Sequence, residues 1–218
     1  MIDFGSRLDR TIRRWPTEHA RNWVRAFLEE ATQSPEVLAV VALGSSVRPN
    51  VPSEDVDLLV LCSEGSDLTW RAPIEVDLRS SDLSKLERDL ASGGDLATWA
   101  IRYGVPLYDE RSIWAQLASK WRDQLRLPDP DVAESRAAKA YSQFQALSEA
   151  GDDAAANELL VSHLTHRARA VLSRAGIFPA SRPELATQLR SIQDAELGDA
   201  LEAALAVRRQ MASETTVV

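Results

Sequence analysis

Two apolar segments joined by a short polar loop constrain the fold of this chain most strongly. Residues 37–43 form an uninterrupted apolar run that ends at Gly44, and residues 55–62 form a second run that opens on alternating acidic and apolar residues. Short apolar runs rich in β-branched residues and bounded by turn residues are typical of buried strands. Pro49 and Pro52 make the segment between them a loop. The pattern therefore predicts two strands, near 36–43 and 55–62, of one buried sheet.

The turn after the first predicted strand carries groups that suit an anion. Gly44 adopts backbone angles that other residues avoid and lets a ligand approach the main chain. Ser45 and Ser46 add hydroxyl groups, and free backbone N–H groups after a strand form an anion cradle. Arg48 adds a fixed positive charge whose planar guanidinium suits phosphate oxygens. We therefore expect these four residues to bind phosphate groups.

The second predicted strand begins with two carboxylates. Asp55 and Asp57 are two residues apart, so on a strand they share one face, while Val56 and Leu58 point into the core. Two close carboxylates repel each other, and a cation or a proton relieves that repulsion. Carboxylate, water and phosphate oxygens are the ligands that Mg²⁺ prefers. The spacing therefore predicts a divalent metal site beside the phosphate-binding turn.

A third carboxylate comes from an alternating segment at residues 73–79. Its apolar positions are Ile74, Val76 and Leu78, and its polar positions are Glu75, Asp77 and Arg79. If this segment forms a strand beside the second one, Asp77 joins Asp55 and Asp57 around one cation. Glu75 shares the face of Asp77 and is the alternative third carboxylate.

This order of features resembles the signature of the DNA polymerase β-like nucleotidyltransferase superfamily. That signature is a hydrophobic strand, Gly-Ser, a loop, Asp-x-Asp and a third Asp on a later strand. The resemblance covers residues 36–80 well and residues 81–110 loosely, and it is closest to small bacterial nucleotidyltransferases of the antibiotic-modifying and minimal types. The chain departs from the pattern at Pro49, where many relatives have Gly, and at Glu54, where many have Ser.

The resemblance implies a role for each motif residue. Gly44 and Ser45 would contact a triphosphate, Asp55 and Asp57 would bind Mg²⁺, and Asp77 would complete the metal site and help deprotonate an acceptor hydroxyl. The implied activity is Mg²⁺-dependent transfer of a nucleoside monophosphate, AMP from ATP in the first instance, to a hydroxyl. A small molecule such as an aminoglycoside is the leading acceptor, with a protein hydroxyl and a tRNA end as alternatives.

Two other functions are compatible with the same fold. The chain can be an antitoxin-like interaction module with little or no catalysis, because a fold does not fix a function. It can also be a regulatory domain that senses a nucleotide. A long helical second half favours the enzyme, since minimal antitoxin members usually lack one.

Composition excludes several classes of protein. A net charge of −8 argues against a large nucleic-acid surface and suits a cationic acceptor. No apolar run reaches the length of a membrane span, and the N-terminus lacks the apolar stretch of a signal peptide. The single cysteine, Cys62, cannot form an internal disulfide, so we expect a cytoplasmic protein.

The expected fold class is α+β, with a nucleotidyltransferase domain over residues 1–127 and an all-α bundle over residues 128–218. In the first domain a small mixed sheet is flanked by helices. Residues 1–33 look helical, Ser81 is the expected cap of a helix over 82–91, and residues 105–108 predict a last strand. Their apolar and capping patterns are those of amphipathic helices and a short strand. Further helices are expected to follow Asp95 and Asp109.

Prolines at 128 and 130 mark the boundary, and the rest of the chain is rich in helix formers. Helices are expected near 131–149, 153–175, 182–192 and 195–212, and their short connections favour an antiparallel bundle. This half is similar to the helical domains of antibiotic nucleotidyltransferases and to HEPN-type bundles. Catalytic HEPN ribonucleases have Arg, then four to six residues, then His; no Arg stands at that spacing before His163 or His166, so ribonuclease activity is not expected. The bundle is expected to shape an acceptor pocket or a homodimer interface.

Overall fold

The computed structural model describes residues 4–49, 51 and 53–215, and the chain divides into two compact units. The first comprises residues 1–126 and the second residues 127–218. The elements of the first unit are α1 (Phe4–Thr11), α2 (Glu18–Ala31), β1 (Val37–Leu43), the short 3₁₀ helix η1 (Ser45–Val47), β2 (Val56–Cys62), β3 (Val76–Asp82), α3 (Leu83–Ser92), α4 (Asp95–Tyr103), β4 (Val105–Tyr108) and α5 (Ile113–Trp121).

The strands of the first unit form one mixed sheet in the order β3-β2-β1-β4. β1 runs antiparallel to β2 and to β4, whereas β2 and β3 are parallel. The expected α+β class, with a small mixed sheet flanked by helices, is confirmed. The strands predicted near 36–43, 55–62 and 105–108 are β1, β2 and β4.

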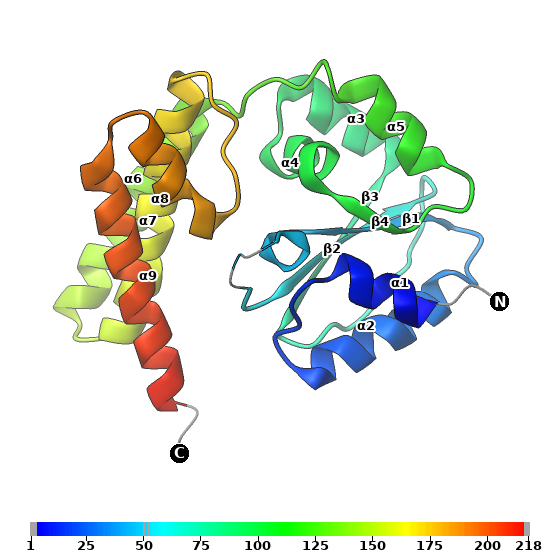
Figure 1. The fold of residues 1–218 in the computed structure, drawn as a ribbon, viewed down its shortest axis with the longest axis horizontal. Helices are drawn as coiled ribbons and strands as arrows, with labels where there is room; N and C mark the ends of the chain where they lie inside the picture. Colours follow the sequence, from blue (N-terminus) through cyan, green and yellow to red (C-terminus); the bar gives the residue numbers. More distant parts are fainter. Residues whose placement is uncertain (1–3, 50, 52, 216–218) are drawn as a thin grey trace. The chain divides into compact units, whose positions relative to one another are not determined.

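Helices cover both faces of this sheet (Figure 1). α1 and α2 pack on one face, where alternate strand residues such as Val40 and Leu58 join their core. α3, α4 and α5 cover the other face, which contains Val41 and Leu59. Since side chains alternate along a strand, the odd-numbered residues of β2, including Asp57, belong to the α3–α5 face.

The third strand differs from its prediction. β3 begins at Val76, three residues later than expected, because the amide of Val76 donates to the carbonyl of Pro73 and closes a turn. Ile74 is 98% exposed in that turn and does not belong to the core. β3 then continues through Ser81, so the helix that follows is capped by Asp82, whose carboxylate accepts from the amide of Lys85 at 2.6 Å.

The connection between β2 and β3 is anchored on α2. The ring of Trp70 meets the ring of Phe27 edge to face at 5.2 Å, and its indole N–H donates to Glu30 at 3.1 Å. These contacts make Trp70 a hydrophobic anchor of the connection, with its polar N–H satisfied.

The second unit is a helical bundle. Its helices are α6 (Pro130–Glu149), α7 (Asp153–Arg174), α8 (Arg182–Ser191) and α9 (Ala195–Thr215), close to the predicted ranges. An apolar stripe of α7, which includes Leu164, Ala168 and Leu172, packs in a core with α8 and α9. The Nδ1 atom of His163 lies 2.9 Å from the carbonyl oxygen of Ala137 on α6, so this histidine joins two helices.

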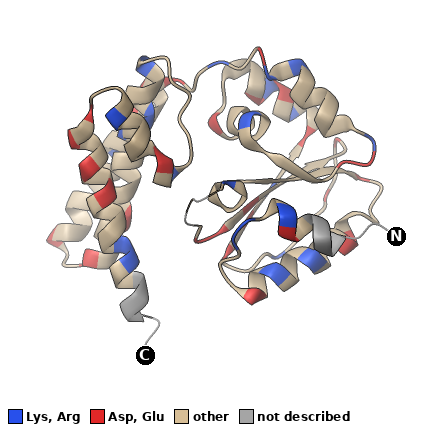
Figure 2. Cartoon of the chain, in the orientation of Figure 1, with Lys and Arg blue, Asp and Glu red and all other residues tan. Residues whose placement is uncertain are grey.

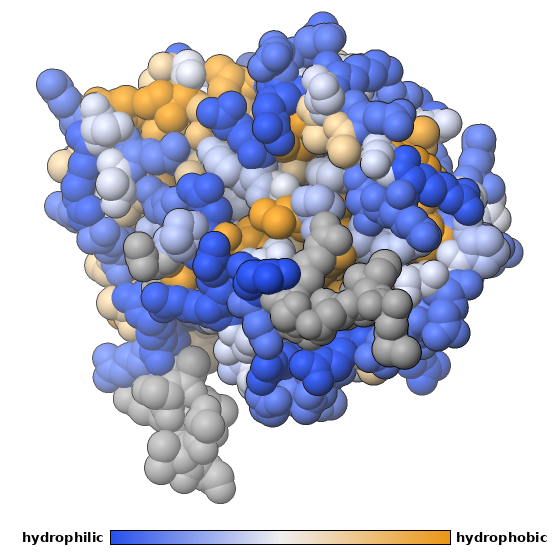
Figure 3. Space-filling view, turned by 45° about the vertical axis from the view of Figure 1, so that its right-hand side comes forward, coloured by the Kyte–Doolittle hydropathy of each residue, from blue (hydrophilic) through white to orange (hydrophobic). Residues whose placement is uncertain are grey.

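Charged and apolar residues are distributed as in an ordinary folded chain. Figure 2 shows mostly uncharged residues along the strands and charges of both signs on the helices. On the face drawn in Figure 3, hydrophobic residues form patches that hydrophilic ones interrupt. Among the helices of the described residues, none is both long and apolar enough to cross a bilayer.

Candidate functional site

The predicted site residues gather at one edge of the sheet. β1 ends at Leu43, which is the register partner of Asp57 at the start of β2. Asp57 is in turn the register partner of Asp77 at the start of β3, and Val105 at the start of β4 pairs with Ala42. The end of β1 and the beginnings of the other three strands therefore meet along this edge, which we call the acidic edge: residues 44–48, 53–57 and 77–79.

Gly44 and Asp57 fit together closely at this edge. Gly44 has φ 74° and ψ −165°, a conformation that is essentially restricted to glycine. A Cβ atom added to it would lie 1.7 Å from Oδ2 of Asp57. The missing side chain therefore makes the space in which the carboxylate of Asp57 lies.

Asp57 and Asp77 share one face of the sheet. They are direct partners of the parallel β2–β3 pair, so their side chains leave the sheet on the same side. Both are partly exposed. Asp55 is exposed and directly precedes β2, which begins one residue later than predicted.

A cation of the chain itself occupies Asp77. Arg79 follows two residues later on β3, and its Nε donates to the two carboxylate oxygens at 3.0 and 3.2 Å, with Nη2 donating at 2.9 Å. These hydrogen bonds, and the charge of Asp77, raise the pKa of the Arg79 guanidinium. The charge of Asp57 acts in the same direction. Arg79 therefore lies in the field of both carboxylates.

The serines of the turn have different roles. Ser45 donates to the hydroxyl of Ser53 at 3.0 Å, and Ser53 donates to the carbonyl oxygen of Asp55 at 2.7 Å. This chain of hydroxyls ties η1 to the loop that carries Asp55. Ser46 is fully buried, and its hydroxyl donates to the carbonyl of Leu43 at 3.1 Å. The side chain of Ser46 therefore stabilises the turn.

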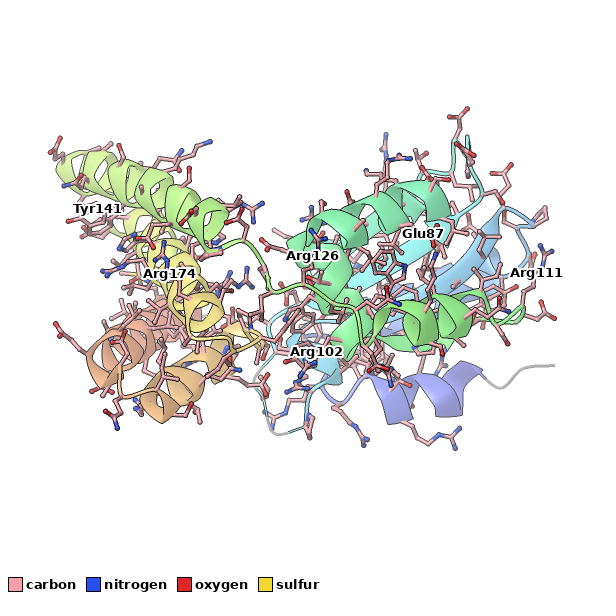
Figure 4. The ribbon with its side chains drawn as sticks, turned by 90° about the horizontal axis from the view of Figure 1, so that it is seen from above. Glu87, Arg102, Arg111, Arg126, Tyr141 and Arg174 are labelled. Atoms are coloured by element: carbon pink, nitrogen blue, oxygen red, sulfur yellow. The ribbon has the colours of Figure 1, made fainter. Side chains whose placement is uncertain are left out.

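Arg48 is held by an aromatic ring. Its guanidinium carbon lies 4.6 Å from the ring centroid of Tyr103, the last residue of α4. Arg102, labelled in Figure 4, has its guanidinium carbon 5.8 Å from the same ring. The ring centroid of Trp99, four residues earlier on α4, lies 4.8 Å from that of Tyr103. A cation over an aromatic face is attracted by the ring quadrupole, so Tyr103 fixes the predicted phosphate-binding arginine.

The donor set at this edge suits a hard divalent cation. Among the described residues, no group of three His, Cys, Asp or Glu side chains is arranged to hold a metal ion. Mg²⁺ usually needs only one or two carboxylates, because substrate phosphates and water complete its ligands. Asp57 and Asp77 supply two carboxylates from adjacent strands, and the carboxylate of Asp57 lies against Gly44.

Comparison with known proteins gives little further information. No protein-family model matches the chain, and no curated protein matches it in sequence. A solved structure with some similarity is a nucleotidyltransferase-like protein from Exiguobacterium sibiricum 255-15. It is 17% identical with a TM-score of 0.36, and the match covers 84% of this chain and 73% of that one. A likeness at this level does not extend to function.

Three residues of the site were not predicted from the sequence: Ser53, Arg79 and Tyr103. The spacing of Arg79 and Asp77 allows their ion pair, since residues two apart on a strand share a face, but it does not by itself establish the contact. The contact between Arg48 and Tyr103 has no such local signal. It depends on β4 pairing with β1, which brings the end of α4 to the end of β1.

Proposed function

We propose that this chain is a nucleotidyltransferase that uses Mg²⁺ and a nucleoside triphosphate, ATP in the first instance. It transfers the nucleoside monophosphate to a hydroxyl group of an acceptor. The observation that carries the proposal is the placement of Asp57, which is in register with Asp77 and lies against Gly44 at the end of β1. This arrangement puts two carboxylates beside a turn that contains a serine hydroxyl and an arginine.

In this proposal Asp57 and Asp77 hold the cation, with Asp55 as a further ligand from the loop before β2. The cation supplies neutralisation of phosphate charge when it is bound. Gly44, Ser45 and Arg48 bind the β- and γ-phosphates. Ser46 contributes only through its backbone, because its side chain is buried.

The reaction is an in-line displacement at phosphorus. The acceptor oxygen forms a bond to the α-phosphorus, and the bond from that phosphorus to the bridging oxygen of the β-phosphate breaks. The electron pair of the broken bond leaves with pyrophosphate, next to Arg48, and Asp77 accepts the proton of the acceptor hydroxyl. Chemistry of this kind depends mainly on positioning and on charge neutralisation, which these side chains supply.

The acceptor is the least constrained part of the proposal. The net charge of −8 favours a cationic small molecule such as an aminoglycoside over a nucleic acid. A protein hydroxyl and a tRNA end are the other acceptors to test.

A second function is favoured by one observation. Arg79 already holds both oxygens of Asp77, and a carboxylate so occupied needs no metal. An interaction module with little or no catalysis, for a protein partner or a second copy of this chain, fits that contact. The two functions differ in whether nucleotide binding depends on Mg²⁺ and on Asp57.

Calorimetric titration with ATP separates the two functions. The enzyme requires binding that needs Mg²⁺ and that weakens at least about tenfold in D57N, because the cation loses a charged ligand. The matched control is D67N, which removes an exposed carboxylate of the β2–β3 connection. Binding that is the same in D57N and D67N favours the interaction module.

Transfer itself is measured with ATP labelled at the α-phosphate. The full chain is incubated with Mg²⁺ and a panel of aminoglycosides, proteins and tRNA, and the label is followed. Label that appears on one class, with release of pyrophosphate and loss of both signals in D57N, supports the enzyme and identifies its acceptor class. If neither the unmodified chain nor the control D67N transfers label to any member of the panel, the enzyme proposal is contradicted.

A further inference from the structure

The contact between Arg79 and Asp77 has a geometry that links it to metal binding. Three hydrogen bonds of 2.9 to 3.2 Å join the guanidinium to both oxygens of the carboxylate. A bidentate contact of this kind uses the oxygen lone pairs that a divalent cation would use. The cation and Arg79 therefore compete for Asp77.

Asp57 extends the competition to a second carboxylate. It is the register partner of Asp77 on the adjacent strand, and its charge acts on Arg79. Two neighbouring carboxylates without a cation repel each other. Arg79 relieves this repulsion in the chain without metal, so it does there what a bound cation does in the proposed active state.

The ion pair is also accessible enough to open. The side chain of Arg79 is 59% exposed and that of Asp77 is 42% exposed. Ion pairs in contact with water contribute little to stability, because solvent screens them and both side chains lose freedom. A guanidinium released from Asp77 stays at the acidic edge, where its planar fork fits phosphate oxygens.

We infer that Arg79 is an internal counter-ion of the acidic edge, which weakens divalent metal binding until the cation displaces it from Asp77. The inference rests on the proposed function, which supplies the reason for a metal at this edge. It assigns Arg79 a positioning role. Metal alone then binds weakly, and metal accompanied by triphosphate binds better, because the phosphates offer the displaced guanidinium a new partner.

The test is a titration of the full chain with Mn²⁺ alone, followed by the electron paramagnetic resonance signal of free Mn²⁺. R79Q removes the charge and keeps a side chain of similar shape, and we expect it to bind Mn²⁺ about three- to tenfold more tightly than the unmodified chain. The matched control is R71Q, which removes an exposed arginine of the β2–β3 connection and leaves the affinity unchanged. D77N breaks the ion pair from its other side and is expected to weaken Mn²⁺ binding.

Two further measurements make the outcome decisive. R79K keeps the charge and loses the fork, so its affinity is expected to lie between those of the unmodified chain and R79Q; circular dichroism checks that every variant is folded. Equal or weaker Mn²⁺ binding by R79Q, or no Mn²⁺ bound by any variant at millimolar concentration, overturns the inference. Tighter binding by R79Q without transfer from ATP to any acceptor leaves the counter-ion standing and removes the proposed function. If transfer depends on Asp57 while R79Q binds Mn²⁺ as the unmodified chain does, the proposed function stands and the counter-ion role of Arg79 is excluded.

Discussion

The carboxylate of Asp57 lies where a side chain on Gly44 would be, with its Oδ2 atom 1.7 Å from the ideal Cβ position. This contact joins the end of β1 to the start of β2 and leaves no room for any other residue at position 44. It also gives a substitution whose effect has a matched control.

G44A is expected to destabilise the first unit more than G65A does. Both glycines have φ near 75°, so each substitution introduces backbone strain of about 1–3 kcal/mol. Only G44A adds a clash, because a Cβ on Gly65 would have no atom within 4 Å. The clash is expected to cost a further 1–3 kcal/mol or so, as overpacking of a filled site does.

Urea unfolding followed by tryptophan fluorescence measures this difference. All six tryptophans belong to residues 1–126, so the signal reports on the first unit. Equal losses in G44A and G65A would mean that Asp57 moves aside at no cost, and would contradict the close fit.

Y103L is expected to weaken ATP binding by about three- to tenfold, because a cation–π contact between Arg48 and the ring contributes about 0.5–2 kcal/mol. Y103F keeps the ring and is expected to bind as the unmodified chain does. The control is Y141L, which changes a 43% exposed tyrosine on α6, in the other unit (Figure 4). Calorimetry with ATP and Mg²⁺ provides the affinities. A loss in Y103F equal to that in Y103L would assign the effect to the hydroxyl instead of the ring.

W70A is expected to lower the stability of the first unit by about 2 kcal/mol, since it removes the edge-to-face contact with Phe27 and the hydrogen bond to Glu30. I74A is the control from the same connection. Ile74 is 98% exposed, so its truncation should change stability by less than about 0.5 kcal/mol. The five remaining tryptophans report on urea unfolding of W70A. Comparable losses in the two variants would show that Trp70 does not anchor this connection.

The second unit offers a prediction on pH. Arg190 on α8 donates to Glu202 at 2.7 Å and to Asp199 at 2.6 Å. The hydrogen bond from Arg190 and its charge hold the pKa of Glu202 below its ordinary value of 4.5, although the charge of Asp199 acts in the opposite direction. A carboxylate with a lowered folded-state pKa contributes stability above its unfolded-state pKa and loses that contribution as the pH falls through the folded-state value. R190Q is therefore expected to be less stable than the unmodified chain at pH 7, with the difference shrinking below about pH 4.5.

Thermal unfolding followed at 222 nm measures this difference, and tryptophan fluorescence identifies the transition that belongs to the first unit. R167Q, which changes an exposed arginine on α7, is the control. A stability difference between R190Q and the unmodified chain that stays constant from pH 7 to pH 3 would exclude the contribution of Glu202.

Much of the fold was predictable from the sequence because its signals are local. β1 and β2 were recognised from their apolar runs, and the helices of the second unit from helical spacing and capping residues. β3 was placed three residues too early, because Ile74, Val76 and Leu78 alternate as a strand does. The structure uses Pro73 and Ile74 in a turn instead. β3 is an edge strand, and its second half consists of polar residues. The sequence there does not alternate between apolar and polar residues, so the pattern does not predict a strand.

The site was predictable in its motif and not in its contacts. The order of Gly44, Asp57 and Asp77 along the chain was sufficient to expect them together, and the strand register brings the two carboxylates side by side. The charge of Asp77 can be neutralised either by Arg79 or by a cation from solution, and the two compete for it. That competition depends on distances and exposure, which a motif does not contain.

The return from β2 to β3 has a consequence for how the two carboxylates are supported. Parallel neighbours require the chain to travel back along the whole sheet, usually through a helix, but residues 63–75 make this journey without one. What steadies the return is α2, which contacts Trp70 from Glu30 near its end and Glu75 from Thr17 at its start. The two carboxylates are thus supported by different elements. Asp57 belongs to the antiparallel β1–β2 pair, whereas the segment that leads to Asp77 is held by α2 on the opposite face of the sheet. The β2–β3 ladder, which pairs residues 56–62 with residues 76–82, keeps the two carboxylates in register, so α2 secures only the segment that leads into β3.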